Sequence, residues 1–327
     1  MAMTPKENIL AAFRGEAHDY VPNFFTDLDF CGATALTFDA GPLEGGYDDF
    51  GVLWETSVSA GGQACPITTD PVLEDITEWR EKVRFPDIEA FDWEGTAQRQ
   101  VGGADRENRL IEFQMWSGPF ERLTHLMGFE NALCAMYEDP EEVAALMDAI
   151  TDYKIAVLRK AKQYYDPDLV TTLDDVATER GLFMSPSLYR ELIFPAHKRF
   201  NDAAREMGII PLIHCCGKCE DIIPDFIEEG YAAWTSAQPS NDIRTILAST
   251  IGRLAVVGGF DTNGLPARPD STEEEMRAEV RRCIRDYAEF PNYIFFGFKL
   301  ANSPDMSEFM KAIAIMGDEC KKVGKLR

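Results

Sequence analysis

The sequence predicts a single (β/α)8 barrel (TIM barrel) domain spanning residues 1–327. The chain is longer than most domains, yet barrels of this class routinely reach ~250 residues or more around one core. From residue 109 onward, short apolar runs alternate with longer helical patterns, as expected of parallel strands buried on both faces. No linker, internal repeat or low-complexity tract divides the chain. The competing open doubly wound sheet lacks its Gly-x-Gly-x-x-Gly turn after a strand.

The first predicted elements are a helix and a strand. Thr4, Pro5 and Glu7 form a capping-box pattern with proline at the first helical position, which predicts a helix over about residues 5–15. The apolar run 21–25 then predicts the first barrel strand, because a proline is tolerated where a strand begins.

Six further apolar runs predict barrel strands. They cover residues 110–116, 169–173, 209–213, 232–235, 254–257 and 293–296. Together with the run at 21–25 they give seven strands. We expect the eighth strand within residues 40–105, a region rich in Gly, Asp and Pro that otherwise predicts loops and short elements covering one end of the barrel.

Charge and cysteine content narrow the classes of function. The chain has 32 Lys and Arg residues against 56 Asp and Glu, a net charge of −24, which argues against nucleic-acid binding. No segment has the length of apolar sequence that spans a membrane, and residues 1–7 lack a secretion-signal pattern. We therefore expect a cytoplasmic protein whose eight cysteines are reduced.

The strongest motif directly follows the predicted strand 209–213. His214 and Cys216 lie on one side of an extended chain, Gly217 permits a tight turn, and Cys219 is spaced from Cys216 as in Cys-x-x-Cys. Zinc prefers such imidazole and thiolate ligands. Two alternatives remain open at this point, a buried cysteine cluster with a core histidine and a redox-active dithiol.

Three acidic residues follow the preceding predicted strand. Asp174 and Asp175 come directly after the run 169–173, and Glu179 lies four residues further on. The ends of neighbouring barrel strands face one cavity, so Asp175 or Glu179 could complete a metal shell or accept a hydrogen bond from His214. The alternative is that the paired aspartates only cap the following turn.

The motifs in combination resemble the uroporphyrinogen decarboxylase superfamily. The resemblance rests on residues 174–190, 214–217 and 222–224, and on the blocks 8–16 and 128–140. It covers nearly the whole chain and independently implies a (β/α)8 barrel.

Two branches of this superfamily differ in chemistry. The true decarboxylases carry an Arg-Gln-Ala-Gly-Arg-Tyr segment after the first strand and a late histidine segment, whereas here residues 26–30 read Thr-Asp-Leu-Asp-Phe and no histidine follows His214. The cobamide-dependent methyltransferases hold zinc with His-x-Cys and a later cysteine, and His214 and Cys216 match the first two ligands. The later cysteine is missing, because residues 296–300 read Phe-Gly-Phe-Lys-Leu.

The resemblance therefore implies a zinc-dependent methyltransferase that moves a methyl group from a small methylated substrate to the cobalt of a separate corrinoid protein. Residues 214–220 look closest to the aryl methyl ether (veratrol-type) enzymes. We expect His214 and Cys216 to bind zinc with Cys219 as third ligand, because the turn at Gly217 can bring the two thiolates together, and with Glu179 next in line.

The remaining expected roles concern the substrate. Asp175 is the candidate catalytic acid that delivers a proton to the leaving oxygen. Aromatic residues at strand ends are candidates for the walls of a flat substrate pocket: Phe24, Phe113, Trp116 and Trp234, with Phe296 and Phe298. The rival functions are a cofactor-free decarboxylase, which the missing arginines disfavour, and a zinc-storing or redox-sensing protein.

Overall fold

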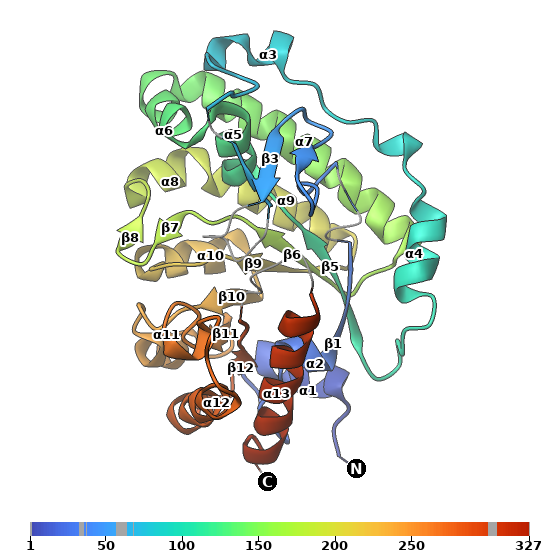
Figure 1. Ribbon diagram of the computed structural model, residues 1–327, viewed down its shortest axis with the longest axis vertical. Coiled ribbons are helices and arrows are strands. Elements are labelled where there is room, and N and C mark those ends of the chain that lie inside the picture. The colour runs from blue at the N-terminus through green and yellow to red at the C-terminus, as the bar shows by residue number, and fades with distance from the viewer. Residues whose placement is uncertain are drawn as a thin grey trace.

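A parallel β-sheet forms the centre of the computed structural model, which describes residues 2–32, 36, 38–56, 64–67, 69–299 and 306–326. Within these residues the sheet has seven strands in the spatial order β1-β5-β6-β9-β10-β11-β12, the order of the chain (Figure 1). They are β1 (Leu28–Gly32), β5 (Leu110–Met115), β6 (Leu169–Leu173), β9 (Ile210–His214), β10 (Ala233–Ala237), β11 (Ala255–Gly259) and β12 (Tyr293–Phe296).

Six of the predicted strands are confirmed. β6 and β12 have the predicted bounds, and β5, β9, β10 and β11 differ from them by one or two residues at an end. All six are buried on both faces over most of their length, which explains why continuous apolar runs identified them.

The predicted first strand at residues 21–25 is wrong. The side chain of Asn23 accepts hydrogen bonds from the backbone N–H groups of Phe25 and Thr26, and this cap begins the short helix α2 (Phe24–Asp27). The first strand, β1, follows at Leu28. Asn23 itself forms only an isolated parallel bridge with Phe295 of β12.

The predicted eighth strand is not found in the described part of residues 40–105. There β2 (Gly46–Tyr47), β3 (Leu53–Thr56) and β4 (Ala64–Pro66) form a separate antiparallel sheet. The structure thus shows a parallel seven-stranded sheet consistent with the predicted barrel, without a closed ring of eight strands among the described residues.

Most of the described helices pack outside the sheet, and the larger apolar core lies between the two layers (Figure 1). The helices are α1 (Pro5–Phe13), α3 (Trp79–Lys82), α4 (Trp93–Val101), α5 (Pro119–Met127), α6 (Phe129–Glu138), α7 (Pro140–Tyr164), α8 (Pro186–Leu192), α9 (Phe194–Glu206), α10 (Ile223–Glu229), α11 (Ile243–Thr250), α12 (Glu273–Tyr287) and α13 (Ser307–Val323). Single 3₁₀ turns are η3 (Ile76–Glu78), η4 (Ile88–Ala90), η5 (Glu220–Ile222) and η6 (Leu265–Ala267). No helix in the described ranges combines the length and apolar character needed to cross a membrane.

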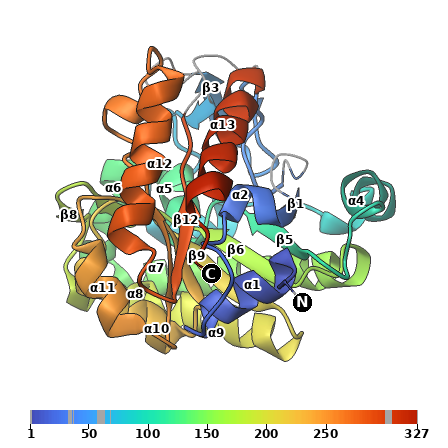
Figure 2. The same cartoon turned by 90° about the horizontal axis from the view of Figure 1, so that it is seen from below.

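A second apolar cluster covers the inner face of the sheet near the start of its strands. Helix α1 has the predicted capping box at Thr4 and contributes Ile9 and Phe13 to this cluster. There they pack with Leu28, Leu110 and other residues at which strands begin. Helix α13 lies beside α12 and contacts α2 (Figure 2). The C-terminal strand ends are therefore the end of the sheet left for a functional site.

Candidate metal and active site

The predicted motif lies at the C-terminal end of the sheet. Strand β9 ends at His214, and Cys216 follows two residues later, which confirms that both residues belong to the same strand end. Asp175 lies two residues beyond the end of the neighbouring strand β6. In parallel α/β structures this end of the sheet carries the reactive groups.

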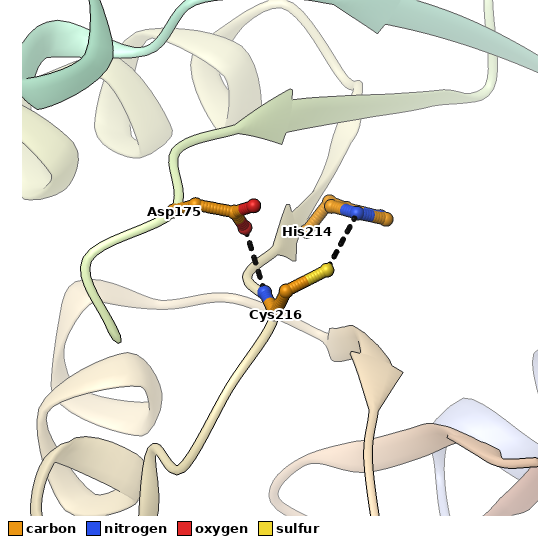
Figure 3. A group of neighbouring side chains, drawn as sticks. All are labelled: Asp175, His214 and Cys216. Carbon is orange, nitrogen blue, oxygen red and sulfur yellow. Dashed lines mark hydrogen bonds between the residues drawn. The ribbon is translucent and has the colours of Figure 1, made fainter. Parts of the chain in front are cut away.

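Asp175, His214 and Cys216 converge, as Figure 3 shows, and each offers one ligand atom within 4.8 Å of the others. The Cys216 Sγ lies 3.6 Å from His214 Nε2, and an Asp175 oxygen accepts a 2.7 Å hydrogen bond from the Cys216 backbone N–H. This is the one such group of three among the described residues. Oxygen, nitrogen and sulfur donors in this number match a catalytic zinc site with three protein ligands.

Protonation of the three side chains fits a cation-binding site. Burial lowers the pKa of His214, although the Asp175 carboxylate opposes this change. Burial also raises the pKa of Asp175 and raises that of the Cys216 thiol well above its usual range, to which the Asp175 charge adds. Without a cation this partly buried group therefore favours its neutral forms, and a divalent ion would displace protons from Asp175 and Cys216.

The end of β10 and the loop after it hold the segment that carries the two ligands. Thr235 Oγ1 lies 3.0 Å from His214 Nδ1, and Ser236 Oγ lies 3.1 Å from Cys216 Sγ. Further along, side chains bond the backbone of residues 217–219: Gln238 Oε1 accepts from the Gly217 N–H, and Asn241 Oδ1 accepts from the Cys219 N–H. The geometry of the candidate site thus depends on β10 as well as on β9.

Gly217 allows the tight turn that its position predicted. Its φ is +90°, and an added Cβ would lie 2.7 Å from the Thr178 carbonyl oxygen. Replacement by alanine is therefore expected to destabilise the fold by roughly 1–3 kcal/mol and to weaken metal binding, because the turn between the ligands must distort. Unfolding in urea and metal titration measure both effects. Gly103→Ala is the matched control, since nothing lies within 4 Å of its Cβ position, and equal effects of both substitutions would contradict this role.

Cys219 and Glu179, the two candidates for a third metal ligand, lie outside the described group of three. The buried Cys219 Sγ is directed toward Cys215, 3.5 Å away, so the turn pairs Cys219 with Cys215 instead of with Cys216. Glu179 is exposed between β7 (Ala177–Thr178) and β8 (Gly181–Leu182), where it accepts a hydrogen bond from Asn263. Of the acids expected to face His214, the structure brings only Asp175 there.

Asp174 has a structural role, although its carboxylate caps helix α5 and not the turn that follows it, as the alternative had proposed. It is fully buried, and its carboxylate accepts hydrogen bonds from the Phe120 and Glu121 N–H groups at the start of α5. Its other contact is His197 Nε2, at 2.8 Å. Asp174 therefore anchors α5 and the chain next to Asp175.

Glu121 is a site neighbour that sequence reasoning missed. Its carboxylate accepts a 3.3 Å hydrogen bond from the Asp175 N–H. Burial, together with the charges of Asp175 and Asp174, raises the pKa of Glu121 well above its usual range. Its position in the first turn of α5, the helix that follows β5, was the available signal, because it places an acid close to a third strand end.

The predicted aromatic residues divide into two groups. Phe24 packs edge-on against Phe296, whose ring lies 6.2 Å from that of His214, and Phe298 contacts Phe296 as well. Phe25 stacks on Phe296 at 4.9 Å and extends this cluster. These rings form one apolar cluster, which reaches His214 through Phe296.

Two of the other predicted pocket residues, Phe113 and Trp234, lie elsewhere, whereas the role of Trp116 stays a prediction. Phe113 is fully buried on the outer face of the sheet against Tyr165, and Trp234 is buried there too, where its indole N–H donates to the Cys215 carbonyl. Trp116 follows β5, and its backbone N–H donates to Asp39. Period-two alternation directs Phe113 and Trp234 away from the inner face, which an apolar run alone does not reveal.

Comparisons with known proteins agree with this architecture. The family model described as Uroporphyrinogen decarboxylase (URO-D) matches residues 57–301. A methylated-thiol–coenzyme M methyltransferase of Methanosarcina mazei is 24% identical over 315 residues, covering 86% of this chain and 81% of the relative. A uroporphyrinogen decarboxylase of Syntrophotalea carbinolica is 31% identical over 166 residues, 49% of this chain and 43% of that protein. Among solved structures, a methyltransferase from Methanosarcina mazei shares the fold with a TM-score of 0.66 and 14% identity, over 98% of this chain and 99% of that one.

Proposed function

Because the chain belongs to the uroporphyrinogen decarboxylase family, we propose that it is a zinc-dependent methyltransferase. It would move a methyl group from a small methylated substrate to the cobalt of a separate corrinoid protein. The observation that carries this proposal is the convergence of Asp175, His214 and Cys216 at the strand ends. The relative that aligns over most of its length is a methyltransferase, which supports the same branch of the family.

We assign the three zinc ligands to His214 Nε2, Cys216 Sγ and an Asp175 oxygen. Asp175 thereby takes the place proposed from sequence for Cys219 or Glu179, and it is a ligand instead of a free proton donor. A bound zinc would supply Lewis-acid chemistry toward the donor's oxygen or sulfur. The protein's own part is to fix three donors within 4.8 Å and leave one tetrahedral position free for the substrate.

We propose an aryl methyl ether as the methyl donor. The support is the phenylalanine cluster that reaches His214 through Phe296, formed by Phe24, Phe25, Phe296 and Phe298. Aromatic rings bind a flat apolar group by stacking and edge-on contact, whereas methanol offers them little area to bury. Phe25 and Phe298 are only partly buried and so have ring surface available to a ligand.

The decarboxylase alternative has less support in the site. Within the described ranges, the hydrogen-bond partners of Asp175, His214 and Cys216 are hydroxyl, carboxyl, thiol and backbone groups, and none of them is an arginine. A polycarboxylate substrate would need such cations. We also propose that the protein works in the cytoplasm, a reducing compartment that its eight free cysteines support. We propose further that the chain forms one domain.

The test is a methyl-transfer assay on the purified protein with its metal content measured in parallel. We expect about one zinc per chain and demethylation of a phenyl methyl ether with cob(I)alamin as acceptor, followed by the absorbance change of cobalt. Methanol and methanethiol are the comparison donors. Release of carbon dioxide from a carboxylated substrate by metal-free protein, without methyl transfer, would contradict the proposal.

A further inference from the structure

We propose that Thr235 and Ser236, two consecutive residues of β10, are positioning residues that place one hydroxyl group on each of two zinc ligands. This inference rests on the proposed function and deepens it. Thr235 Oγ1 lies 3.0 Å from His214 Nδ1, and Ser236 Oγ lies 3.1 Å from Cys216 Sγ. Both serine and threonine are buried, so neither hydroxyl has bulk water as an alternative partner.

An irregularity of the strand makes this arrangement possible. In a regular strand consecutive side chains point to opposite faces, so only one of the two hydroxyls could reach the site. The pairing of β10 with β11 shifts register between Thr235 and Ala237, and Ser236 has a φ of +66°. Such a bulge re-aims a side chain locally, and here it directs Ser236 toward the same ligands as Thr235.

The neighbouring strand is adapted to the bulge. An added Cβ on Gly258 of β11 would lie 2.4 Å from the Ala237 carbonyl oxygen, so a side chain there would collide with the irregular backbone. A left-handed φ is unfavourable for serine and favourable for glycine. The sequence nevertheless has serine at 236, where it makes the contact with Cys216. Strained backbone of this kind concentrates at functional sites.

Each hydroxyl has a distinct chemical task. A metal-bound Cys216 thiolate can only accept hydrogen bonds, so the Ser236 hydroxyl would donate to it and withdraw charge from the sulfur. With His214 Nε2 bound to the metal, Nδ1 carries the ring proton, and Thr235 Oγ1 is its acceptor. The pair would thus hold the imidazole in one tautomer and adjust the electron donation of the thiolate.

The experiment compares Ser236→Gly and Thr235→Val with wild type. Two controls lie away from the ligands, one at a left-handed residue replaced by glycine and one at a threonine replaced by valine. Asp166→Gly relieves another left-handed residue, φ +44°, in the loop before β6, and Thr172→Val removes a buried hydroxyl that has no partner among the described residues. Three quantities are measured: the melting temperature of the metal-free protein, the affinities for Zn²⁺ and Co²⁺ by chelator competition, and the sulfur-to-cobalt charge-transfer band.

The expected result separates strain from function. Ser236→Gly should melt at the wild-type temperature or ~1–3 °C above it, because glycine relieves the strained backbone, yet bind metal ~10-fold more weakly and shift the charge-transfer band. Thr235→Val should lose a similar ~10-fold in affinity with a smaller shift of the band. Both controls should leave affinity and band unchanged.

Three outcomes overturn the inference in distinguishable ways. If wild type binds metal and both variants bind it equally tightly with an unchanged band, the hydroxyl pair has no positioning role, while the proposed function stands. If wild type binds neither metal, the proposed function fails and this inference fails with it. A large loss of melting temperature in Ser236→Gly would show that the serine is retained for folding, which also contradicts the proposal.

Discussion

Replacing Cys216 by alanine is expected, under the proposed function, to leave the protein without zinc and to lower methyl transfer by more than ~100-fold. Outer partners of metal ligands typically contribute ~10–100-fold, so the loss of a direct ligand should exceed that range. Asp175→Asn should also weaken zinc binding, because a neutral amide oxygen replaces a carboxylate 2.7 Å from the Cys216 N–H. Metal analysis of the dialysed proteins and the cobalt absorbance assay measure the two effects.

Two matched variants test the ligand assignment itself. Cys219→Ala removes a thiol four residues from Cys215 that the structure places against Cys215, and Glu179→Gln removes an exposed carboxylate. Both proteins should keep their zinc. Loss of zinc from Cys219→Ala, with full zinc in Asp175→Asn, would transfer the third ligand position back to the cysteine. Full zinc in the Cys216 variant would refute the metal site altogether.

Replacing His197 by alanine is expected to destabilise the protein by about 3–5 kcal/mol, the usual effect of leaving buried charges without their partner. His197 is buried between two carboxylates, with Nε2 2.8 Å from Asp174 and Nδ1 3.6 Å from Glu229. Removal of the imidazole leaves both acids facing each other across a cavity. Urea unfolding of wild type and variant measures the difference.

The same histidine predicts a pH dependence. Burial alone would lower the pKa of His197, but the carboxylates of Glu229 and Asp174 outweigh it and raise the pKa to about 10. A raised folded-state pKa stabilises the fold fully below the unfolded value of ~6.5, and this contribution is lost as pH rises through about 10. Wild type should therefore lose more stability than His197→Gln between these pH values. If the melting temperatures of the two proteins changed with pH by the same amount, a charged His197 would be contradicted.

The strands that sequence predicted best are those buried on both faces, because a short continuous apolar run bounded by polar residues is typical of a buried parallel strand. β6 and β12 are examples. The prediction of the first strand was wrong for a local reason. Asn23 caps a helical turn, and the apolar residues after it are equally suited to strand or helix. The antiparallel β2-β3-β4 sheet is short and partly exposed, so it leaves little periodicity to detect.

The location of the candidate site at the strand ends could be predicted from the sequence, but the full set of its ligands could not. His214, Cys216 and Asp175 were identified because polar residues directly followed apolar runs. Cys219 was chosen by sequence proximity, but the backbone after Gly217 directs its side chain to Cys215. Thr235 and Ser236 gave no signal, since a bulge with positive φ at a serine has no sequence signature.

The two ends of the chain are hydrogen-bonded to each other. The Val21 N–H donates to the Gly324 carbonyl, Tyr20 pairs with Lys325, and the Phe295 N–H donates to the Pro22 carbonyl. During synthesis these contacts can form only after residues 295, 324 and 325 leave the ribosome, whereas Asp175, His214 and Cys216 all precede them in the chain. The strands that carry the ligands can therefore pair before residues 20–22 find their partners.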